Sequence, residues 1–358
     1  MKKIIAILMV IAMVLGLAAC GGSSAPAAST TAPAASTPAT TTTQAPAAST
    51  EPAKLLASPL TFKLCFTENP DTAIGTLIPA AAEKVTELTN GEINFEICPS
   101  AQLGANPDVM EQLINGAPVI TAAGYDNMSA FVPACNVPCT PYVFESIDEI
   151  FKYGTTDAWQ SMKSDIIAAG YQPICLGSWG LRCFISSKKI TCADDIKGLI
   201  VRMGNSAASQ NFVTVMGGSP TTSAWADNYS LIQNGTIDAC EAPVDLLWSS
   251  SLYEVCDYLC LSNHLATPGM FVISPDFWAQ IPAEYQAIME ETFGKAMEDV
   301  ATEFKNSQAD YVAKFKEAGT EVCENPDVAS FAAYVPKLFD YLGYDVADYE
   351  ALRAAVEN

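Results

Sequence analysis

Positive charge is scarce in this 358-residue sequence, which has 18 lysines and arginines against 40 aspartates and glutamates, a formal net charge of -22. This excess of negative charge argues against nucleic acid and anionic membrane surfaces as partners. Only one histidine is present, His264, so the side chain most used for acid–base catalysis is nearly missing, and we expect His264 to be structural. The sequence also lacks G-x-S-x-G, H-E-x-x-H, a Walker loop and G-x-G-x-x-G after a strand. An enzyme is therefore the weaker hypothesis.

The N-terminus has the composition of a secretory signal. Two lysines precede a sixteen-residue apolar run from Ile4 to Ala19, which is shorter than the roughly 20 residues of a membrane-spanning helix. The following LAAC-G resembles a bacterial lipobox, which predicts a lipoprotein signal peptide over residues 1–19 and a lipid on Cys20. An ordinary signal peptide with a chance cysteine is the alternative. We expect an extracytoplasmic protein held on the cell membrane by its lipid.

The next segment lacks the large apolar side chains that form a hydrophobic core. Residues 21–53 contain no aromatic side chain and one charge, Glu51. Such a composition cannot bury enough apolar surface to offset its ordering entropy. We therefore predict that residues 20–55 are the lipidated cysteine and a disordered Ala/Ser/Thr/Pro tether.

Eleven cysteines remain after Cys20, an odd number that cannot pair completely within the chain. Cys135/Cys139 and Cys256/Cys260 share a C-x₃-C spacing, so a zinc site is conceivable. However, such sites usually need further cysteine or histidine ligands. The alternative is that the cysteines serve as small apolar residues. We expect no metal and no cofactor.

Strand and helix patterns alternate from residue 58 onward. Residues 61–66 and 93–97 have strand patterns, and a helical repeat lies between them and ends at Asn90-Gly91. Residues 172–179 and 182–187 read as two further strands. A helical stripe that begins after Pro282 predicts a helix of about 35 residues, near 50 Å long, which is longer than one small domain. The alternation predicts an α/β protein with βαβ units and a mainly parallel sheet.

Arginine is the rarest cation, with only Arg182, Arg202 and Arg353 in the chain. A guanidinium meets a carboxylate through two parallel hydrogen bonds. Arg202 ends the strand GLIVR, and open α/β sheets bind ligands outside their strand ends. Each arginine therefore has two possible partners. One is an acidic side chain of the same protein, and the other is an anionic ligand.

Several motifs together resemble the solute-binding subunit of tripartite ATP-independent periplasmic (TRAP) transporters, the DctP-type receptors. The resemblance covers about residues 60 to 320 and is specific in combination. The matching segments are WGLR, DIKGLIVRMGN, AWADNYSLIQNGTIDACEAP, YEVCDYLCLSNH and, upstream, ELTNGEINFEICPSAQLGANPDVMEQLINGA.

The resemblance implies a two-lobed, periplasmic-binding-protein-like fold with crossing hinge strands and one long domain-spanning helix. The lobes would comprise residues 56–180 plus 268–307 and residues 181–267 plus 308–358. The receptor would close around a small organic acid and deliver it to the membrane permease subunits of the transporter, without chemistry on the ligand.

The resemblance also implies site residues. Arg202 falls on the arginine that pairs with the ligand carboxylate, and Arg182 on a second arginine of the site. Asn205 matches a site asparagine, and Trp225 matches the aromatic residue that packs on the body of the ligand.

Other positions are less well matched. In the other lobe, Gly124 and Asn127 lie in a loop that aligns with site residues, and Thr67 follows the first strand. Ala242 stands where the family often has asparagine, which removes one expected ligand hydrogen bond. Trp179 stands where a small or polar residue is common. These two departures suggest an apolar or aromatic acid as ligand, unless Trp179 is simply packing at the hinge.

Three other interpretations stay open at this point. The protein could be a binding lipoprotein for a sensor or for another importer, which neighbouring genes would reveal. It could be a secreted enzyme that uses paired carboxylates such as Glu254 and Asp257, in which case it would transform its ligand. It could be a cysteine-rich metal lipoprotein, in which case it would contain bound metal.

Overall fold

The computed structural model describes residues 54–357. The expected signal peptide, the lipidated Cys20 and nearly all of the tether lie outside these residues. The described strands are β1 (Leu60–Cys65), β2 (Ile93–Cys98), β3 (Val119–Gly124), β4 (Gln172–Ser186), β5 (Ile200–Arg202), β6 (Ser219–Thr221), β7 (Ala239–Pro243), β8 (Tyr258–Ile273) and β9 (Glu321–Cys323).

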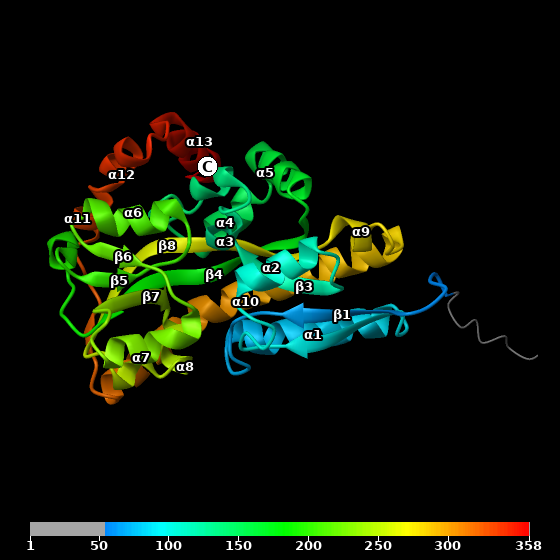
Figure 1. Ribbon diagram of the computed structural model, residues 1–358, viewed down its shortest axis with the longest axis horizontal. Helices are drawn as coiled ribbons and strands as arrows, with labels where there is room; N and C mark the ends of the chain where they lie inside the picture. Colours follow the sequence, from blue (N-terminus) through cyan, green and yellow to red (C-terminus); the bar gives the residue numbers. More distant parts are fainter. Residues whose placement is uncertain (1–53, 358) are drawn as a thin grey trace, which may run out of the picture. The chain divides into compact units, whose positions relative to one another are not determined.

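Helices cover these strands on both sides (Figure 1). The α-helices are α1 (Ala73–Leu88), α2 (Asn106–Ile114), α3 (Tyr125–Met128), α4 (Ile147–Tyr153), α5 (Asp157–Ala168), α6 (Ala207–Val215), α7 (Asn228–Gln233), α8 (Val244–Ser249), α9 (Pro275–Trp278), α10 (Ala283–Glu317), α11 (Val328–Ala332), α12 (Val335–Leu342) and α13 (Val346–Glu357). The 3₁₀ turns are η1 (Pro133–Asn136), η2 (Ala193–Ile196), η3 (Trp225–Asp227) and η4 (Leu252–Glu254).

The described strands form one nine-stranded mixed sheet in the order β2-β1-β3-β8-β4-β7-β5-β6, with β9 beside β8. Five of its eight strand pairings are parallel, as the alternating pattern predicts. The three antiparallel pairings all involve β4 or β8. These two strands therefore join the two groups of parallel strands into one sheet.

β4 corrects a prediction from the sequence. Residues 172–179 and 182–187 are not two strands but one, which continues through Gly180. Gly180 has φ +83° and lies at a register shift between Ser178 and Leu181 in the pairing with β8. Glycine reaches this backbone conformation without the steric cost that other residues pay, so it provides a bend that looks like a chain break in the sequence.

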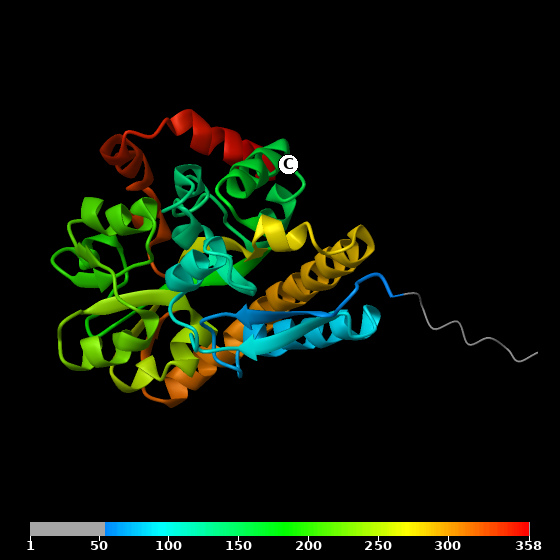
Figure 2. The ribbon, with the colours of Figure 1, turned by 45° about the vertical axis from the view of Figure 1, so that its right-hand side comes forward.

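The long helix is present as predicted. α10 has 35 residues and runs from the side of α9 to a position beneath α7 and α8, in both views of the ribbon (Figure 2). Its Phe293 is buried in a cluster with residues of β1 and α1, whereas its Phe315 is buried with residues of β7 and α8. One helix thus contributes to the cores at both ends of the sheet.

The C-terminal helix α13 lies where the expected lobe boundaries would not place it. Arg353 of α13 donates to the Val143 carbonyl oxygen at 3.0 Å and to Glu149 Oε2 at 2.7 Å, both in the expected first lobe. Leu352 and Val356 are buried in the same cluster as Ile150 of α4. α13 therefore packs against residues of the expected first lobe, although the expected boundaries assign residues 308–358 to the second lobe.

Nine of the eleven described cysteines are buried, and all eleven are free. The two C-x₃-C pairs lie in hydrophobic clusters, where they pack as small apolar side chains. Among residues 54–357, no group of three or more His, Cys, Asp or Glu side chains could hold a metal ion. The same residues contain no helix both long and apolar enough to span a membrane.

Candidate functional site

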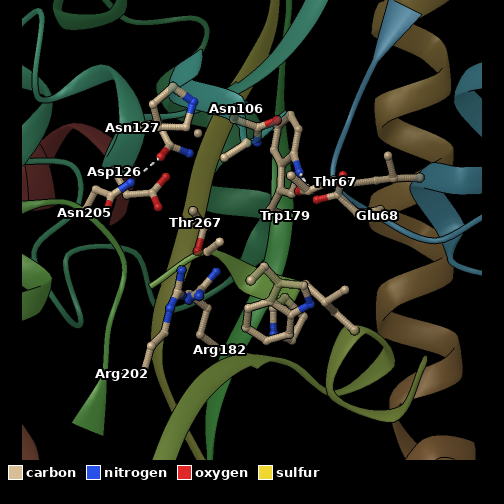
Figure 3. A pocket seen from close by; sticks show the side chains of 18 of the residues that line it. Thr67, Glu68, Asn106, Asp126, Asn127, Trp179, Arg182, Arg202, Asn205 and Thr267 are labelled. Atoms are coloured by element: carbon tan, nitrogen blue, oxygen red, sulfur yellow. Dashed lines mark hydrogen bonds between the residues drawn. The ribbon is translucent and has the colours of Figure 1, made fainter. Parts of the chain in front are cut away.

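A cavity of about 370 Å³ brings together residues from strand ends and loops on both sides of β4 and β8. All eight residues expected to bind a ligand line it, although they come from distant parts of the chain. They are Thr67, Gly124, Asn127, Trp179, Arg182, Arg202, Asn205 and Trp225. Figure 3 shows most of these side chains around one space. That they contact a ligand stays a prediction.

Arg202 reaches the cavity from the end of β5, which lies beside β7 through the pairing of Arg202 with Cys240. Its side chain is 9% exposed, and it donates one hydrogen bond, to the Ser223 carbonyl oxygen at 3.0 Å. Its Nε is buried and has no partner within residues 54–357. Burial lowers the pKa of Arg202, with Glu241 opposing and Arg182 adding to the effect. Arg202 is thus a buried cation in contact with the cavity and without a carboxylate bound to it.

Arg182, in contrast, is paired with an acidic side chain of the protein itself. Its guanidinium donates to the side chain of Glu241 through Nε and through Nη2, the latter at 2.8 Å, and to the Glu241 carbonyl oxygen at 2.8 Å. Burial alone would lower the pKa of Arg182, but the Glu241 charge and hydrogen bonds raise it above its ordinary value. Of the two partners that the sequence left open, the structure gives Arg182 the internal one.

Glu241 was not singled out from the sequence, although it lies in the motif that contains Ala242. It is 1% exposed, and its Oε2 lies 3.7 Å from Nε2 of His264, the buried histidine that stacks on Phe184. Burial alone would raise the pKa of Glu241, but the Arg182 charge outweighs this and lowers the pKa to about 2. His264 is fully buried, and burial lowers its pKa. We therefore assign it a structural role, packed beside Glu241 behind the cavity wall.

Trp225 and Asn205 approach the cavity from the second half of the sheet. The Arg202 guanidinium carbon lies 5.5 Å from the centre of the Trp225 ring, within the range of a cation–π contact. Asn205 Nδ2 donates to Asn127 Oδ1 at 2.8 Å, across 78 positions of sequence. This bond connects the loop after β5 with α3, and therefore the two expected lobes.

Trp179 is both a core residue and a wall of the cavity. It is 9% exposed, lies in the cluster with Phe271, and its indole Nε1 donates to Glu68 Oε1 at 2.9 Å. Its ring lies directly over Gly269, because a Cβ at that position would be 2.5 Å from two of its ring atoms. Glycine at position 269 is therefore what lets the indole lie against β8.

Gly269→Ala is expected to displace the indole of Trp179 and to break its bond to Glu68. Overpacking of this kind usually costs about 1–3 kcal/mol of stability. Ligand affinity should fall as well, because one wall of the cavity moves. Unfolding in denaturant and tryptophan fluorescence would measure both effects, and Gly294→Ala, where a Cβ meets nothing within 4 Å, is the control. Unchanged fluorescence and affinity would show that the cavity does not depend on this packing.

The cavity is also lined by three carboxyl groups that were not predicted from the sequence. They are Glu68, Asp126 and Asp245. Each follows the carboxyl end of a strand: β1, β3 and β7 respectively. Their position after strand ends is the signal in the sequence that marks them, because open α/β sheets bind ligands outside their strand ends.

Ala242 has a different role from the one its alignment implies. It is fully buried in a cluster with Cys183 and Leu247, and it is not among the residues that line the cavity. The neighbouring Pro243 lines the cavity instead. The missing asparagine therefore leaves no gap in the wall.

Comparisons with known proteins identify the family of the chain. The model of the family DctP, "Bacterial extracellular solute-binding protein, family 7", matches residues 67–343. The chain is 26% identical over 260 residues to the sialic acid-binding periplasmic protein SiaP of Vibrio cholerae, which covers 72% of this chain and 80% of that protein. It is 24% identical over 266 residues to the C4-dicarboxylate-binding periplasmic protein DctP of Rhodobacter capsulatus, covering 74% and 80%.

Among solved structures, a TRAP periplasmic solute-binding protein of Actinobacillus succinogenes with bound L-galactonate superposes with a TM-score of 0.79. It is 25% identical, and the match covers 83% of this chain and 99% of that one. Because the family model spans well over half of the sequence, the chain belongs to bacterial extracellular solute-binding protein family 7, the extracytoplasmic substrate receptors of TRAP transporters.

Proposed function

We propose that this receptor captures a small organic acid in the cavity, with the ligand carboxylate bound to Arg202. The observation that carries the proposal is the state of Arg202. Its buried guanidinium lines the cavity, and within residues 54–357 its Nε has no partner and no acidic side chain is bound to it. A buried charge is costly unless it is paired, so an anionic ligand would supply the missing partner. The acids named for the relatives and structural neighbours support the same class of ligand.

Arg182 would act as a second, pre-oriented donor. Because Glu241 holds its guanidinium in place, Arg182 would add hydrogen bonds without contributing a full free charge. Trp225, with its indole fixed by a 2.9 Å bond to Ser250 Oγ, would cover the body of the ligand. We expect Asn205, Asn127, Gly124 and Thr67 to complete the contacts.

Binding would be coupled to movement of the two lobes, whose expected boundaries fall within β4, β8 and α10. Besides the Asn205–Asn127 bond, Asn69 Nδ2 donates to the Ser249 carbonyl oxygen at 3.3 Å, which again joins the expected lobes. Closure would exclude water and so strengthen the pairing between arginine and carboxylate. The closed receptor, anchored through a lipid on Cys20, would then deliver the unchanged acid to the TRAP permease. It would not be an enzyme.

A thermal-shift screen of the purified full chain against a library of organic acids tests the proposal. A ligand at 100 times its Kd should raise the free energy of unfolding by about 2.7 kcal/mol and the melting temperature by several degrees. Ligand recovered unchanged after prolonged incubation is the expected result for a receptor. Stabilisation by neutral sugars or metal ions, with none by any acid, would contradict the proposal.

A further inference from the structure

Two buried carboxyl groups that line the cavity are only partly satisfied by hydrogen bonds within residues 54–357. Glu68 and Asp245 are each 5% exposed and line the cavity. Glu68 Oε2 and Asp245 Oδ1 are buried, and neither has a hydrogen-bond partner in the part of the chain that the structure describes. Unpartnered buried polar atoms are rare in folded proteins, and here two of them occur on the wall of one cavity.

Glu68 lies apart from the positive side chains, and Asp245 lines the same cavity. Burial raises the pKa of both carboxyl groups, and the charge of Glu68 adds to the rise for Asp245, whose pKa is about 7. Figure 3 shows Glu68 beside Trp179 on one side, and Arg182 and Arg202 on the other, with Thr267 between them. The Thr267 hydroxyl is also buried without a partner among residues 54–357.

The cavity wall has few cations. Among the described residues that line it, Arg182 and Arg202 are the only basic side chains. A neighbouring hollow of about 280 Å³ is lined by Asp245 together with Asp71 and Glu303, so the negative region continues behind the cavity wall. Trp179 donates to Glu68 through one indole N–H, which satisfies a single carboxyl oxygen.

We propose that the ligand is a zwitterion, with a carboxylate bound by Arg202 at one end and a cationic nitrogen, an ammonium or amidinium group, bound by Glu68 and Asp245 at the other. The proposal rests on the proposed function, because it uses the carboxylate at Arg202 to fix the direction of the ligand. A cationic nitrogen brings both the N–H donors that the free carboxyl oxygens lack and the charge that balances them. A dicarboxylate of the same length would place its second carboxylate against two acidic side chains.

Trp179 supports the same ligand through Glu68. Its indole N–H holds Glu68 Oε1, and Glu68 Oε2 stays available for a donor of the ligand. Selectivity would come from repulsion of a second anionic group as much as from attraction of the cationic one.

The test uses straight-chain acids of four to six carbons that differ only at the far end. One series carries a terminal ammonium group, the second a hydroxyl and the third a carboxylate. Isothermal titration of the purified full chain at pH 7.5 would measure each Kd. We expect the best ω-amino acid to bind at least tenfold more tightly than its hydroxy analogue, and more tightly still than the dicarboxylate.

Variants assign the preference to the two carboxyl groups. The Glu68→Gln/Asp245→Asn double variant should lose the preference for the ω-amino acid while retaining binding of the hydroxy acid. Glu324→Gln, an acidic residue outside the cavity, should leave the preference unchanged, and circular dichroism would check that each variant is folded. Equal or tighter binding of the hydroxy acid or dicarboxylate by the unmodified protein would overturn the zwitterion proposal alone. Failure of all three series, with another acid of the library still bound, would overturn the zwitterion proposal alone as well. Only failure of every acid in the library would overturn the proposed function with it.

Discussion

Replacing Arg202 with alanine should weaken binding of the acid by about 100-fold or more. Removal of one member of a buried, hydrogen-bonded charge pair usually costs about 2–5 kcal/mol of binding free energy, and much of this cost comes from the charge left unpaired. Here the unpaired charge would be the ligand carboxylate inside a cavity where Arg202 is the cation without an acidic partner of its own. The measurement is the Kd by isothermal titration.

The same variant should keep its stability without ligand. Arg202 in the empty cavity is a buried charge whose Nε lacks a partner, so its removal should leave the free energy of unfolding unchanged or raise it. Arg202→Lys retains the charge but not the planar fork, and we expect an intermediate loss of affinity. Lys197→Ala, which removes an exposed positive charge, is the control for long-range effects on an anionic ligand. If Arg202→Ala bound the acid as tightly as the unmodified protein, Arg202 would be structural and the assignment of the site wrong.

The second large effect concerns Glu241. Glu241→Ala should lower the free energy of unfolding by about 3–5 kcal/mol, because it leaves the buried Arg182 guanidinium without its carboxylate. Denaturant unfolding would measure the loss. In a double-mutant cycle with Arg182→Ala, the double variant should be less destabilised than the sum of the two single variants, since it leaves neither charge unpaired. Additive effects would show that the two side chains do not stabilise each other.

The pH dependence of the free energy of unfolding should reflect the same pairing of Arg182 with Glu241. Although burial opposes ionisation of Glu241, the Arg182 charge lowers its pKa from 4.5 to about 2. The stability due to this depressed pKa is present above pH 4.5 and is lost as the pH falls from 4.5 towards 2. Its size is about 3 kcal/mol. Glu241→Gln should lack this component, so the stability difference between it and the unmodified protein should shrink over that interval. A constant difference from pH 6 to pH 3 would contradict the pairing.

Much of the fold could be predicted because the local patterns agree with the tertiary structure. The apolar alternation of Ile93, Phe95 and Ile97 gives β2, and the stripe after Pro282 gives α10 to within a residue or two. The continuity of β4 could not be predicted, because a glycine is expected both where a strand ends and where a continuous strand bends. The contact of α13 with α4 depends on partners about 200 residues apart, which no local pattern contains.

The candidate site, too, could be predicted only in part. Its arginines were visible because arginine is rare in this chain, and its remaining predicted residues came from resemblance to the family. Glu68, Asp126 and Asp245 were missed because they are three among 40 acidic residues. Their position after strand ends distinguishes all three, and Glu68 and Asp245 are also buried, which is a property of the folded chain.

The position of α13 has a consequence for the order in which the protein is assembled. The cluster around α4 is completed by Leu352 and Val356, and Arg353 binds Glu149, so the last dozen residues cover a surface made from residues near position 150. During synthesis this surface must therefore stay uncovered until α13 has been made. A chain that lacks residues 346–357 should expose the apolar face of α4 to chaperones and proteases.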